Sequence, residues 1–384
     1  MSSFFLSEDE LLVKNTVRDY AREQIAPRAA QYDAAEEFPW ENFRGLADLG
    51  LLGLTIDEQY GGSGGTTRQL VVAIEEIAKA CAATSTTFLA HLSLCTQFIN
   101  MYGTEGQKKE FIPRLISGNE VGAFALTEAG SGSDAGAMQT TVEARSGHYL
   151  LNGSKTFITS GPEASILVVL ATHDKSLKTR GINAIIMERK TEGFLVNPIK
   201  GKMGIRGSSI GELLFENCVV PTENRMGEEG EGFRHTMNVL NASRISIAAQ
   251  CVGIAQSAYE HALDYIQRRE AFGQSLSNFQ GIQWNISEMA TSVHAARLMT
   301  LQAASLRDAG KPFIKEASMA KLYGSRVAVE LADKAVQLHG GVGYLSPSPV
   351  ERIYRDAKVT EIYEGTSEIQ RLIIARQILD SGNI

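Results

Sequence analysis

The spacing of apolar residues changes twice along this chain of 384 residues, and this change constrains the fold more than any single motif. Up to about residue 120, apolar residues recur every three or four positions, as in Leu70–Ala80, which predicts successive amphipathic helices. From Val121, short apolar runs such as ILVVLA and INAIIM predict strands, and from Phe233 the helical spacing returns. We therefore predict an α+β protein with an N-terminal helical domain (1–120), a middle antiparallel β domain (121–231) and a C-terminal four-helix bundle (232–384).

Particular segments refine this prediction. The dipeptide Asn152-Gly153 is a strong signal for a two-residue hairpin turn, and Thr140–Ala144 is expected to be a strand that feeds it. The apolar stripe of Met237–Gln267 predicts one long bundle helix, and the stripe from Ile282 to Ala296 predicts the next.

Composition places the chain among ordinary globular proteins. Hydrophobic residues make up 43% and charged residues 21%, so neither a disordered nor a membrane class is favoured, and no apolar run approaches the ~20 residues that cross a bilayer. The N-terminal sequence MSSFFLSEDE lacks the basic region of a secretory signal and the arginines of a transit peptide. We expect a cytoplasmic protein, or a mitochondrial matrix protein if the chain is a processed eukaryotic form. A net charge of −7 without a Lys/Arg cluster disfavours nucleic acid.

The cysteines do not indicate a metal site. The four occur without a C-x-x-C pair and are expected to be buried thiols in a reducing compartment. His91 and Cys95 share a helix face, but two ligands do not make a site, so core packing is the favoured interpretation.

Glu364 is a candidate catalytic base within the stretch DAKVTEIYEGTSEIQR. It is followed by Gly365 and by the helix-capping residues Thr366 and Ser367. A helix is predicted after them, over Glu368–Leu379. A turn before a helix start offers free backbone N–H groups, so a base and an oxyanion donor would lie side by side. The alternative is a solvated loop acid.

The glycine-rich stretch Gly61–Gly65 raises a different class of function. Its sequence GGSGG fits the G-x-S-x-G nucleophile elbow of a serine hydrolase, with Leu52–Ile56 as the preceding strand and Ser63 as nucleophile. That fold needs strands alternating with helices, whereas the segments after Thr67 are predicted to be helical one after another. A flexible link between helices is therefore favoured.

The loop Thr127–Gly136, TEAGSGSDAG, also matches the G-x-G-x-x-A pattern of a nicotinamide-binding turn. Such a turn must run into a helix and meet an acidic residue about twenty positions later, but a strand is predicted next and Lys155 stands near that place. Consecutive small residues expose backbone N–H groups, and Thr127 and Ser133 add hydroxyls. This set of donors suits an electron-rich ring such as a flavin.

Several ordered motifs resemble the acyl-CoA dehydrogenase family. The nine residues IYEGTSEIQ resemble the segment that carries its catalytic base, and FALTEAGSGSDA followed by LNGSKTFIT resembles its two flavin-contacting segments. Asn241–Arg244 resembles its CoA-contacting segment, and REAFG with Gln280 and QLHGG resemble its motifs for the flavin of a neighbouring subunit. The resemblance covers nearly the whole chain and is strongest to short-chain and branched-short-chain members.

The resemblance implies FAD as cofactor and a homotetramer, a dimer of dimers, in which each flavin is shared between subunits. Residues expected to contact the flavin within one subunit are Phe124, Ala125, Leu126, Thr127, Gly132, Ser133, Phe157, Ile158, Thr159, Thr366, Ser367 and Glu368. Residues expected to contact it from a neighbouring subunit are Arg269, Phe272, Gln280, Gln337, Leu338, Gly340 and Gly341. Phe157 stands where many members have Trp, which keeps an aromatic cover but loses an N–H donor.

The resemblance also implies a reaction. Glu364 would remove the α-proton of an acyl-CoA, and the β-hydrogen would leave as hydride to flavin N5, which gives the trans-2-enoyl-CoA. The electrons would then pass from the reduced flavin to an electron-transfer flavoprotein. Expected substrate contacts are Ser133, Asn241, Arg244, Tyr363 and Gly365. Many members have Asp in place of Asn241, and a surface arginine is the alternative for Arg244. Some members carry the base immediately before Arg244, but Ser243 cannot be a carboxylate base.

The acyl group stays open at this point. Short, branched and cyclic acyl-CoAs are favoured, with medium-chain or dicarboxylic, glutaryl-type substrates as alternatives. Ser85 stands where glutaryl-type relatives place a carboxylate-binding Arg, which disfavours that alternative. A flavoprotein that transfers electrons or serves as a scaffold without turnover would leave Glu364 idle.

Overall fold

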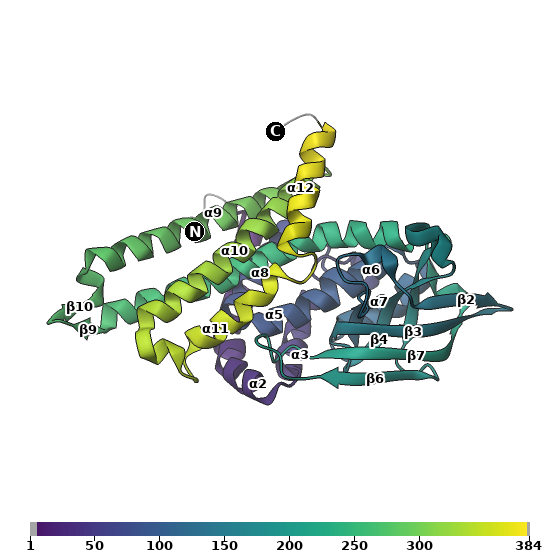
Figure 1. Cartoon of the computed structure of the whole chain (residues 1–384), viewed down its shortest axis with the longest axis horizontal. Coiled ribbons are helices and arrows are strands. Elements are labelled where there is room, and N and C mark those ends of the chain that lie inside the picture. Colours follow the sequence, from purple (N-terminus) through teal and green to yellow (C-terminus); the bar gives the residue numbers. More distant parts are fainter. Residues whose placement is uncertain (1–5, 382–384) are drawn as a thin grey trace.

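The computed structural model describes residues 6–381 and confirms the three-part α+β organisation (Figure 1). Helices of the N-terminal part pack against the long C-terminal helices, and the sheet lies at one end. The N-terminal helices are α1 (Glu8–Tyr20), α2 (Ala29–Ala35), α3 (Trp40–Asp48), α4 (Thr67–Ala80), α5 (Ala82–Leu89), α6 (Gln97–Tyr102) and α7 (Glu105–Ile116). A capping box between Thr66 and Gln69 begins α4, and a buried π-helical stretch, Ala90–Thr96, joins α5 to α6.

The middle domain is a sheet of eight strands, and it is mixed rather than purely antiparallel as predicted. Its strands are β1 (Val121–Ala125), β2 (Thr141–Arg145), β3 (His148–Thr159), β4 (Ala164–Thr172), β5 (Ile182–Glu188), β6 (Phe194–Ile199), β7 (Ile210–Pro221) and β8 (Arg225–Met226). They are ordered β6-β7-β3-β2-β4-β5-β8, and β1 pairs with β4 in parallel. Because β1 enters from the helical domain and packs on Ala90–Thr96, where Gly122 makes room for Cys95, its direction is set by that contact rather than by a hairpin.

The predicted hairpin turn at Asn152-Gly153 is wrong. These residues lie inside β3, where Asn152 is opposite Thr141 of β2, and the chain reverses instead at Ser146-Gly147. Gly153 has a φ of +139° and lies at an irregularity in the pairing with β7. A Cβ there would be 2.7 Å from the backbone of Thr140, so the glycine allows a close approach of two strands rather than a turn.

The C-terminal part is helical, as expected. It contains α8 (Gly232–Arg268), α9 (Gln280–Asp308), α10 (Ile314–His339), α11 (Pro349–Ala357) and α12 (Ser367–Ser381). A small hairpin of β9 (Glu270–Ala271) and β10 (Gln274–Ser275) joins α8 to α9 at the end of the molecule far from the sheet (Figure 1). Helix α8 packs against α4, α9 and α10, so it is the central helix of the molecule.

The core consists of two hydrophobic clusters that meet at β4. Ile166, Val168 and Leu170 join the cluster that runs through both sets of helices. Leu167 and Val169 face the other cluster, which lies among the strands. Alternate side chains of β4 therefore point to opposite faces of the sheet: one set packs against the helices, and the other set packs among the strands.

The cysteines are buried free thiols, as predicted. His91 is also buried, where its Nδ1 accepts a hydrogen bond of 2.9 Å from the Gly122 N–H and its ring packs on Phe43. Burial lowers the pKa of His91 to about 4, as suits a neutral core histidine. Over residues 6–381, no helix is both long and apolar enough to cross a membrane.

Candidate active site

Glu364 lies on the turn between a 3₁₀ segment, Lys358–Glu361, and α12. Its φ is +51° and that of Gly365 is +98°, so two successive residues adopt left-handed conformations. The turn directs the Glu364 side chain inward, where its Oε2 accepts a hydrogen bond from the hydroxyl of the buried Ser243. Thr366 caps α12, with its Oγ1 3.4 Å from the N–H of Ile369. Glu364 is therefore not a solvated loop acid.

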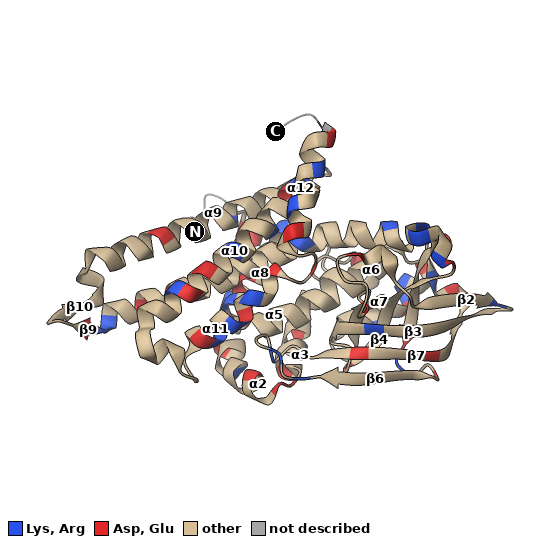
Figure 2. Cartoon of the chain, viewed as in Figure 1, with Lys and Arg blue, Asp and Glu red and all other residues tan. Residues whose placement is uncertain are grey.

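The electrostatic surroundings of this carboxylate come from α8 and α10. Burial raises the pKa of Glu364, while the Ser243 hydrogen bond and the charges of Lys321 and Arg244 oppose that rise. Figure 2 shows charged residues of both signs where α8, α10 and α12 meet. A carboxylate with a raised pKa takes up a proton more readily than an ordinary one, as suits a general base.

Backbone donors lie next to the carboxylate. Among the described residues, the N–H groups of Glu364 and Gly365 have no hydrogen-bond partner, because the turn lies outside the hydrogen-bonded backbone of the helical segments before and after it. Such donors can stabilise negative charge that develops on a carbonyl oxygen.

Arg244 is buried, with 4% of its surface exposed, so the surface-arginine alternative is wrong. Its Nη1 donates a hydrogen bond to Oδ1 of Asn241, one turn earlier on α8, whereas its Nε has no partner among residues 6–381. Burial lowers the pKa of Arg244 to about 10, and the Glu364 carboxylate opposes this shift. The guanidinium stays charged and retains a donor that a bound molecule or water would satisfy.

Tyr363 fixes the other side of the turn. Its hydroxyl donates a hydrogen bond to Oε1 of Gln250, a buried residue of α8. The amide nitrogen of Gln250 in turn donates to Oγ1 of Thr86, at 2.8 Å, and to the carbonyl of Ala82, at 3.1 Å. Because the Tyr363 hydroxyl is engaged within the protein, only its ring and backbone are available to a substrate.

The two segments predicted to contact a flavin lie side by side. The N–H of Thr156 donates to the carbonyl of Thr127 at 2.8 Å, which joins the loop after β1 to β3. Nζ of the fully buried Lys155 strengthens this junction, lying 2.8 Å from Oε1 of Glu128 and 2.9 Å from the carbonyl oxygen of Leu126. Burial lowers the pKa of Lys155 to about 8, so the ammonium is still largely protonated at neutral pH.

The residues at this junction fit a flavin. The ring of Phe157 is 62% exposed on a residue with a φ of +57°, at an irregularity in the pairing of β3 with β7. The hydroxyls of Thr127, Ser133 and Thr159 are without hydrogen-bond partners among the described residues, and the space beside Gly132 is open. An aromatic face with several free donors matches a planar ring that carries acceptors along its edge. Phe124, Ala125 and Ile158 are buried beneath, Leu126 is half-buried, and Thr366, Ser367 and Glu368 begin α12.

The remaining predicted flavin contacts lie at the opposite end of the molecule. Arg269 directly follows the last residue of α8, and the exposed Phe272 lies three residues further on with a φ of +52°. Stacking of Tyr265 on His339, with ring centroids 4.2 Å apart, brings the ends of α8 and α10 together. Gln280, Gln337, Gly340 and Gly341 are exposed there, and Leu338 is half-buried. Within one chain, the structure does not bring this group to the junction of Thr127 and Thr156.

The serine-hydrolase alternative, which the sequence already disfavoured, is wrong. Leu52–Ile56 forms 3₁₀ and turn structure rather than a strand, so the strand before a nucleophile elbow is missing. The N–H of Ser63 donates to the carbonyl of Gly53 at 2.9 Å, and a Cβ at Gly62 would lie 2.1 Å from the carbonyl of Ile56. These glycines permit a compact loop between α3 and α4.

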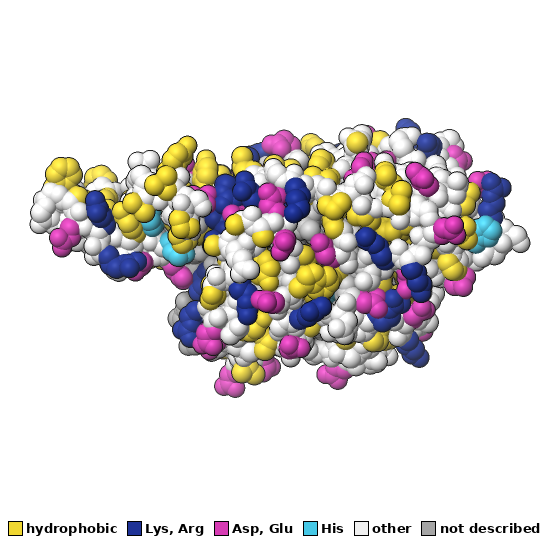
Figure 3. Space-filling view, turned by 90° about the horizontal axis from the view of Figure 1, so that it is seen from below, with side chains coloured by type: hydrophobic (Ala, Val, Ile, Leu, Met, Phe, Trp, Pro, Cys, Tyr) yellow, Lys and Arg dark blue, Asp and Glu magenta, His cyan; other side chains and the backbone are white. Residues whose placement is uncertain are grey.

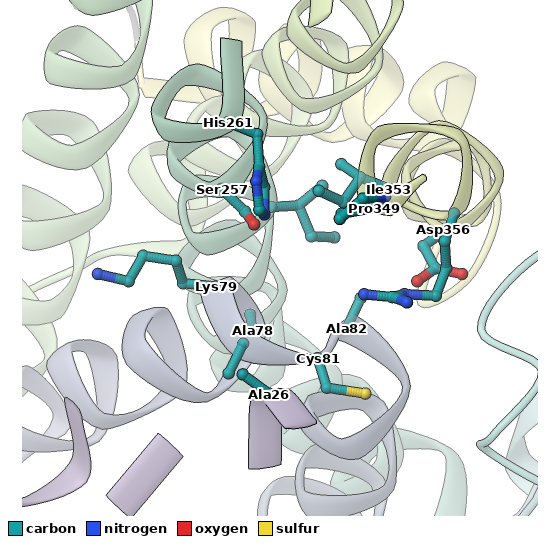
Figure 4. Close-up of a pocket in the computed structure, with 13 residues that line it drawn as sticks. Ala26, Ala78, Lys79, Cys81, Ala82, Ser257, His261, Pro349, Ile353 and Asp356 are labelled. Carbon is teal, nitrogen blue, oxygen red and sulfur yellow. The ribbon is translucent and has the colours of Figure 1, made fainter. Parts of the chain in front are cut away.

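A cavity of about 160 Å³ lies between α8 and α11, away from the predicted site residues (Figure 4). His261 and Ser257 line it from α8, and Arg352 and Asp356 from α11. Burial raises the pKa of Asp356 to about 6, and its Oδ1 accepts a hydrogen bond from the N–H of Ile205. This cavity is separate from the Glu364 site.

Sequence reasoning missed the polar groups that surround Glu364. Ser243 was considered only as a position that lacks a base, and neither Lys321 nor Gln370 was considered. Lys321 carried a usable signal, because a lysine inside the apolar run SMAKLYG falls on the buried face of its helix with Ala317 and Gly324.

Comparison with known proteins decides the family. Sequence models of the N-terminal, middle and C-terminal domains of acyl-CoA dehydrogenases match residues 7–119, 123–218 and 230–379. The chain belongs to the acyl-CoA dehydrogenase family. Acyl-CoA dehydrogenases are FAD-dependent oxidoreductases, and the enzyme, fold and cofactor predictions are thereby confirmed.

Similar acyl-CoA dehydrogenases include the short-chain specific enzyme of Clostridium acetobutylicum, 44% identical over 98% of this chain and 99% of that relative. Butyryl-CoA dehydrogenase from Megasphaera elsdenii has the same fold, with a TM-score of 0.95, 40% identity and coverage of 97% of this chain and 99% of that one. A chain from a structure concerning the electron transferring flavoprotein of Acidaminococcus fermentans gives a TM-score of 0.96 at 42% identity, covering 97% and 98%.

Proposed function

We propose that this acyl-CoA dehydrogenase oxidises short-chain acyl-CoAs to their trans-2-enoyl-CoAs, with Glu364 as the base that removes the α-proton. The observation that carries this proposal is the inward-facing carboxylate of Glu364, which Ser243 holds beside the charge of Arg244. No other acidic side chain among the described residues combines a left-handed turn, a buried hydroxyl donor and adjacent free N–H groups.

The chemistry requires a base that works on a very weak acid. An α-hydrogen beside a thioester is removed only if the enolate oxygen that forms is stabilised and water is kept out. The free N–H of Glu364 can donate to that oxygen, while the carboxylate of the same residue takes the proton. Burial favours the protonated product of this step, whereas the charges of Lys321 and Arg244 favour the ionised form of the starting carboxylate.

The junction of the β1 loop with β3 would hold the cofactor. Leu126, Thr127 and Ser133 would hydrogen-bond the ring edge, and Phe157 would cover one side of the ring. When bound, FAD supplies the two-electron acceptor that takes the β-hydrogen as hydride. The Lys155–Glu128 pair keeps the two segments in register for this contact.

A short acyl group is proposed because the similar enzymes named above are specific for short chains or for butyryl-CoA. Branched and cyclic short acyl groups belong to the same proposal. A glutaryl-type substrate is disfavoured, because Ser85 is fully buried and its hydroxyl has no hydrogen-bond partner among residues 6–381, so it offers no cation for a second carboxylate.

The proposed partners are an electron-transfer flavoprotein and three further copies of this chain. The structural relationship to a chain from an electron transferring flavoprotein structure supports the first. Exposed apolar side chains support the second, because they gather at the end that carries β9 and β10 (Figure 3). They are Phe272, Trp284, Val342, Tyr344 and Leu345. Burying this surface against another copy would also bring Arg269 and Gln337 to a neighbouring flavin.

An anaerobic titration tests the function. The purified enzyme, carrying FAD, is mixed with butyryl-, hexanoyl-, octanoyl-, isobutyryl-, cyclohexanoyl- and glutaryl-CoA, and bleaching of the flavin band is followed in each case. We expect the fastest bleaching with butyryl-CoA or a short branched analogue. A protein that binds no FAD, or whose flavin is bleached by none of these compounds, would overturn the proposal. Preference for octanoyl- or glutaryl-CoA would overturn the short-chain assignment alone.

A further inference from the structure

Lys321 of α10 is a fully buried lysine, with 0% of its surface exposed. No carboxylate of residues 6–381 lies within ion-pair distance of its Nζ. The hydrogen bond that Nζ makes goes to a backbone carbonyl, that of Gly365, at 2.8 Å. Burying an ammonium without an ion pair costs several kcal/mol, so an apolar side chain of the same length would be expected here on grounds of packing alone.

The same carbonyl accepts a second hydrogen bond. Nε2 of the buried Gln370, from the first turn of α12, lies 2.9 Å from the Gly365 oxygen. A charged donor from α10 and a neutral donor from α12 therefore fix the orientation of the Gly365–Thr366 peptide group, one residue beyond Glu364. One carbonyl with two buried donors is held more firmly than one in an ordinary surface turn.

The Gly365 carbonyl is part of the turn that carries the Glu364 carboxylate. Glu364 and Gly365 both have positive φ, a conformation that costs free energy for a glutamate and must be imposed by surrounding contacts. A Cβ on Gly365 would be 2.7 Å from Nε2 of Gln370, so any other residue here would push the Gln370 amide away from the carbonyl. With the carbonyl turned toward Lys321, the Glu364 side chain reaches Ser243 on α8.

The charges that face Glu364 come from three elements. Arg244 contributes from α8 and Lys321 from α10, and both favour the ionised carboxylate. Burial lowers the pKa of Lys321 and Arg244 adds to this fall, while Cys251 of α8, Glu364, and Glu361 of the preceding 3₁₀ segment oppose it. Because burial raises the pKa of the Cys251 thiol to about 12, that thiol is neutral.

We propose that Lys321 is a positioning residue for the proposed base: its ammonium holds the Gly365 carbonyl, fixes the turn that carries Glu364, and sets a positive charge beside that turn. This inference rests on the proposed role of Glu364 and adds a residue to it. Lys321 acts through the turn and through its charge, and it does not touch the reacting atoms.

The test compares Lys321→Met with Gln370→Leu. The first variant removes the charge and its hydrogen bond, and the second removes the neutral hydrogen bond to the same carbonyl. In anaerobic single-turnover reduction by butyryl-CoA, Lys321→Met should move the acid limb of the pH profile upward by about one pH unit or more, because the nearest cation on α10 is gone. Gln370→Leu should lower the rate at every pH without moving the acid limb.

The matched control is Lys334→Met, on the same helix, where the lysine is part-exposed and pairs with Glu288 of α9 at 2.7 Å. Its pH profile should match that of the parent enzyme. Lys321→Gln keeps a donor without the charge, so it should show the same pH shift with a smaller loss of rate on the alkaline plateau. A purely structural role for Lys321 would lower the rate or the folded yield and leave the acid limb in place.

A second measurement does not need turnover. The infrared band of the protonated Glu364 carboxyl, assigned by its loss in Glu364→Gln, should titrate at higher pH in Lys321→Met than in the parent. An unshifted band or acid limb would overturn the proposal, as would failure of both Lys321 variants to fold. Absence of flavin bleaching in the parent enzyme would instead refute the proposed function, and the infrared titration would still report on Lys321.

Discussion

The hydroxyl of Ser243, on α8, donates a hydrogen bond to Oε2 of Glu364, on the turn before α12. By the resemblance described above, some family members would carry their base at this position. Here Ser243 instead supplies a donor to the proposed base, which comes from a different element.

Replacing Ser243 with Ala should make Glu364 a poorer base at low pH. The hydrogen bond from Ser243 favours the ionised carboxylate, so its removal raises the pKa of Glu364 further. Flavin reduction by butyryl-CoA should fall at acidic pH and approach the parent rate at alkaline pH. An equal loss at every pH would show that Ser243 contributes only to packing.

Glu364→Gln should abolish proton abstraction while leaving the shape of the site intact. We expect a loss of about three orders of magnitude or more in the rate of flavin reduction, because a positioned general base is removed. Flavin content and acyl-CoA binding, measured by equilibrium titration, should stay close to those of the parent. A parent-like reduction rate would remove Glu364 from the mechanism.

Lys155→Met should loosen the junction that is proposed to hold the flavin. The substitution leaves the buried Glu128 without its cation, which costs about 3–5 kcal/mol of stability. Lower thermal stability and faster loss of FAD on gel filtration are expected, and adding Glu128→Gln should recover part of both. Lys190→Met, at a lysine whose side chain is 82% exposed, is the control.

Asp356→Asn should change how stability depends on pH. Burial raises the pKa of Asp356 in the folded protein to about 6, above the value of 3.8 for an unperturbed aspartate. The protonated Asp356 carboxyl therefore makes its full contribution to the free energy of unfolding below about pH 4. This contribution, about 3 kcal/mol, is lost as pH rises through about 6, because the carboxyl ionises more readily in the unfolded chain. The variant should lose less stability over this interval in chemical unfolding. A pH dependence equal to that of the parent would contradict the assignment.

Arg269→Ala should weaken the proposed contact with a neighbouring flavin. We expect about tenfold weaker FAD retention, as the loss of one charge-assisted hydrogen bond implies, together with a smaller assembly in light scattering. Arg268→Ala is a close control, because Arg268 is exposed and pairs with Asp264 on its own helix. Equal effects of the two substitutions would argue against a specific role for Arg269.

Much of the fold follows from local sequence patterns. The helical periodicity of Met237–Gln267 predicted α8 to within a few residues, because a buried helix needs apolar side chains at that spacing. The edge strand β6 was missed, since Pro198 and the polar Asn197 mask a strand that pairs on one side only. The hairpin at Asn152-Gly153 was wrong because pairing with β2 and β7 outweighs the local turn preference.

In the candidate site, too, residues of contiguous motifs could be predicted and contacts between distant segments could not. Glu364, Arg244 and the proposed flavin loop could be singled out from the sequence because each motif is contiguous. The contacts of Glu364 with Ser243 and of Gly365 with Lys321 bridge 121 and 44 residues, and only the packing of α8, α10 and α12 creates them. Local patterns contain no information about such distances, which is why the groups that tune the base were not predicted.

Helix α8 runs without interruption over 37 residues, from Gly232 to Arg268. It carries Ser243 and Arg244 near its start, and Arg269 follows directly at its end, so a rod of about 40 Å fixes the interval between the base and the segment proposed to meet a neighbouring subunit. Inserting or deleting a single residue between them would turn one end by about 100° relative to the other. Natural variation along this helix should therefore consist of replacements, with its length kept constant.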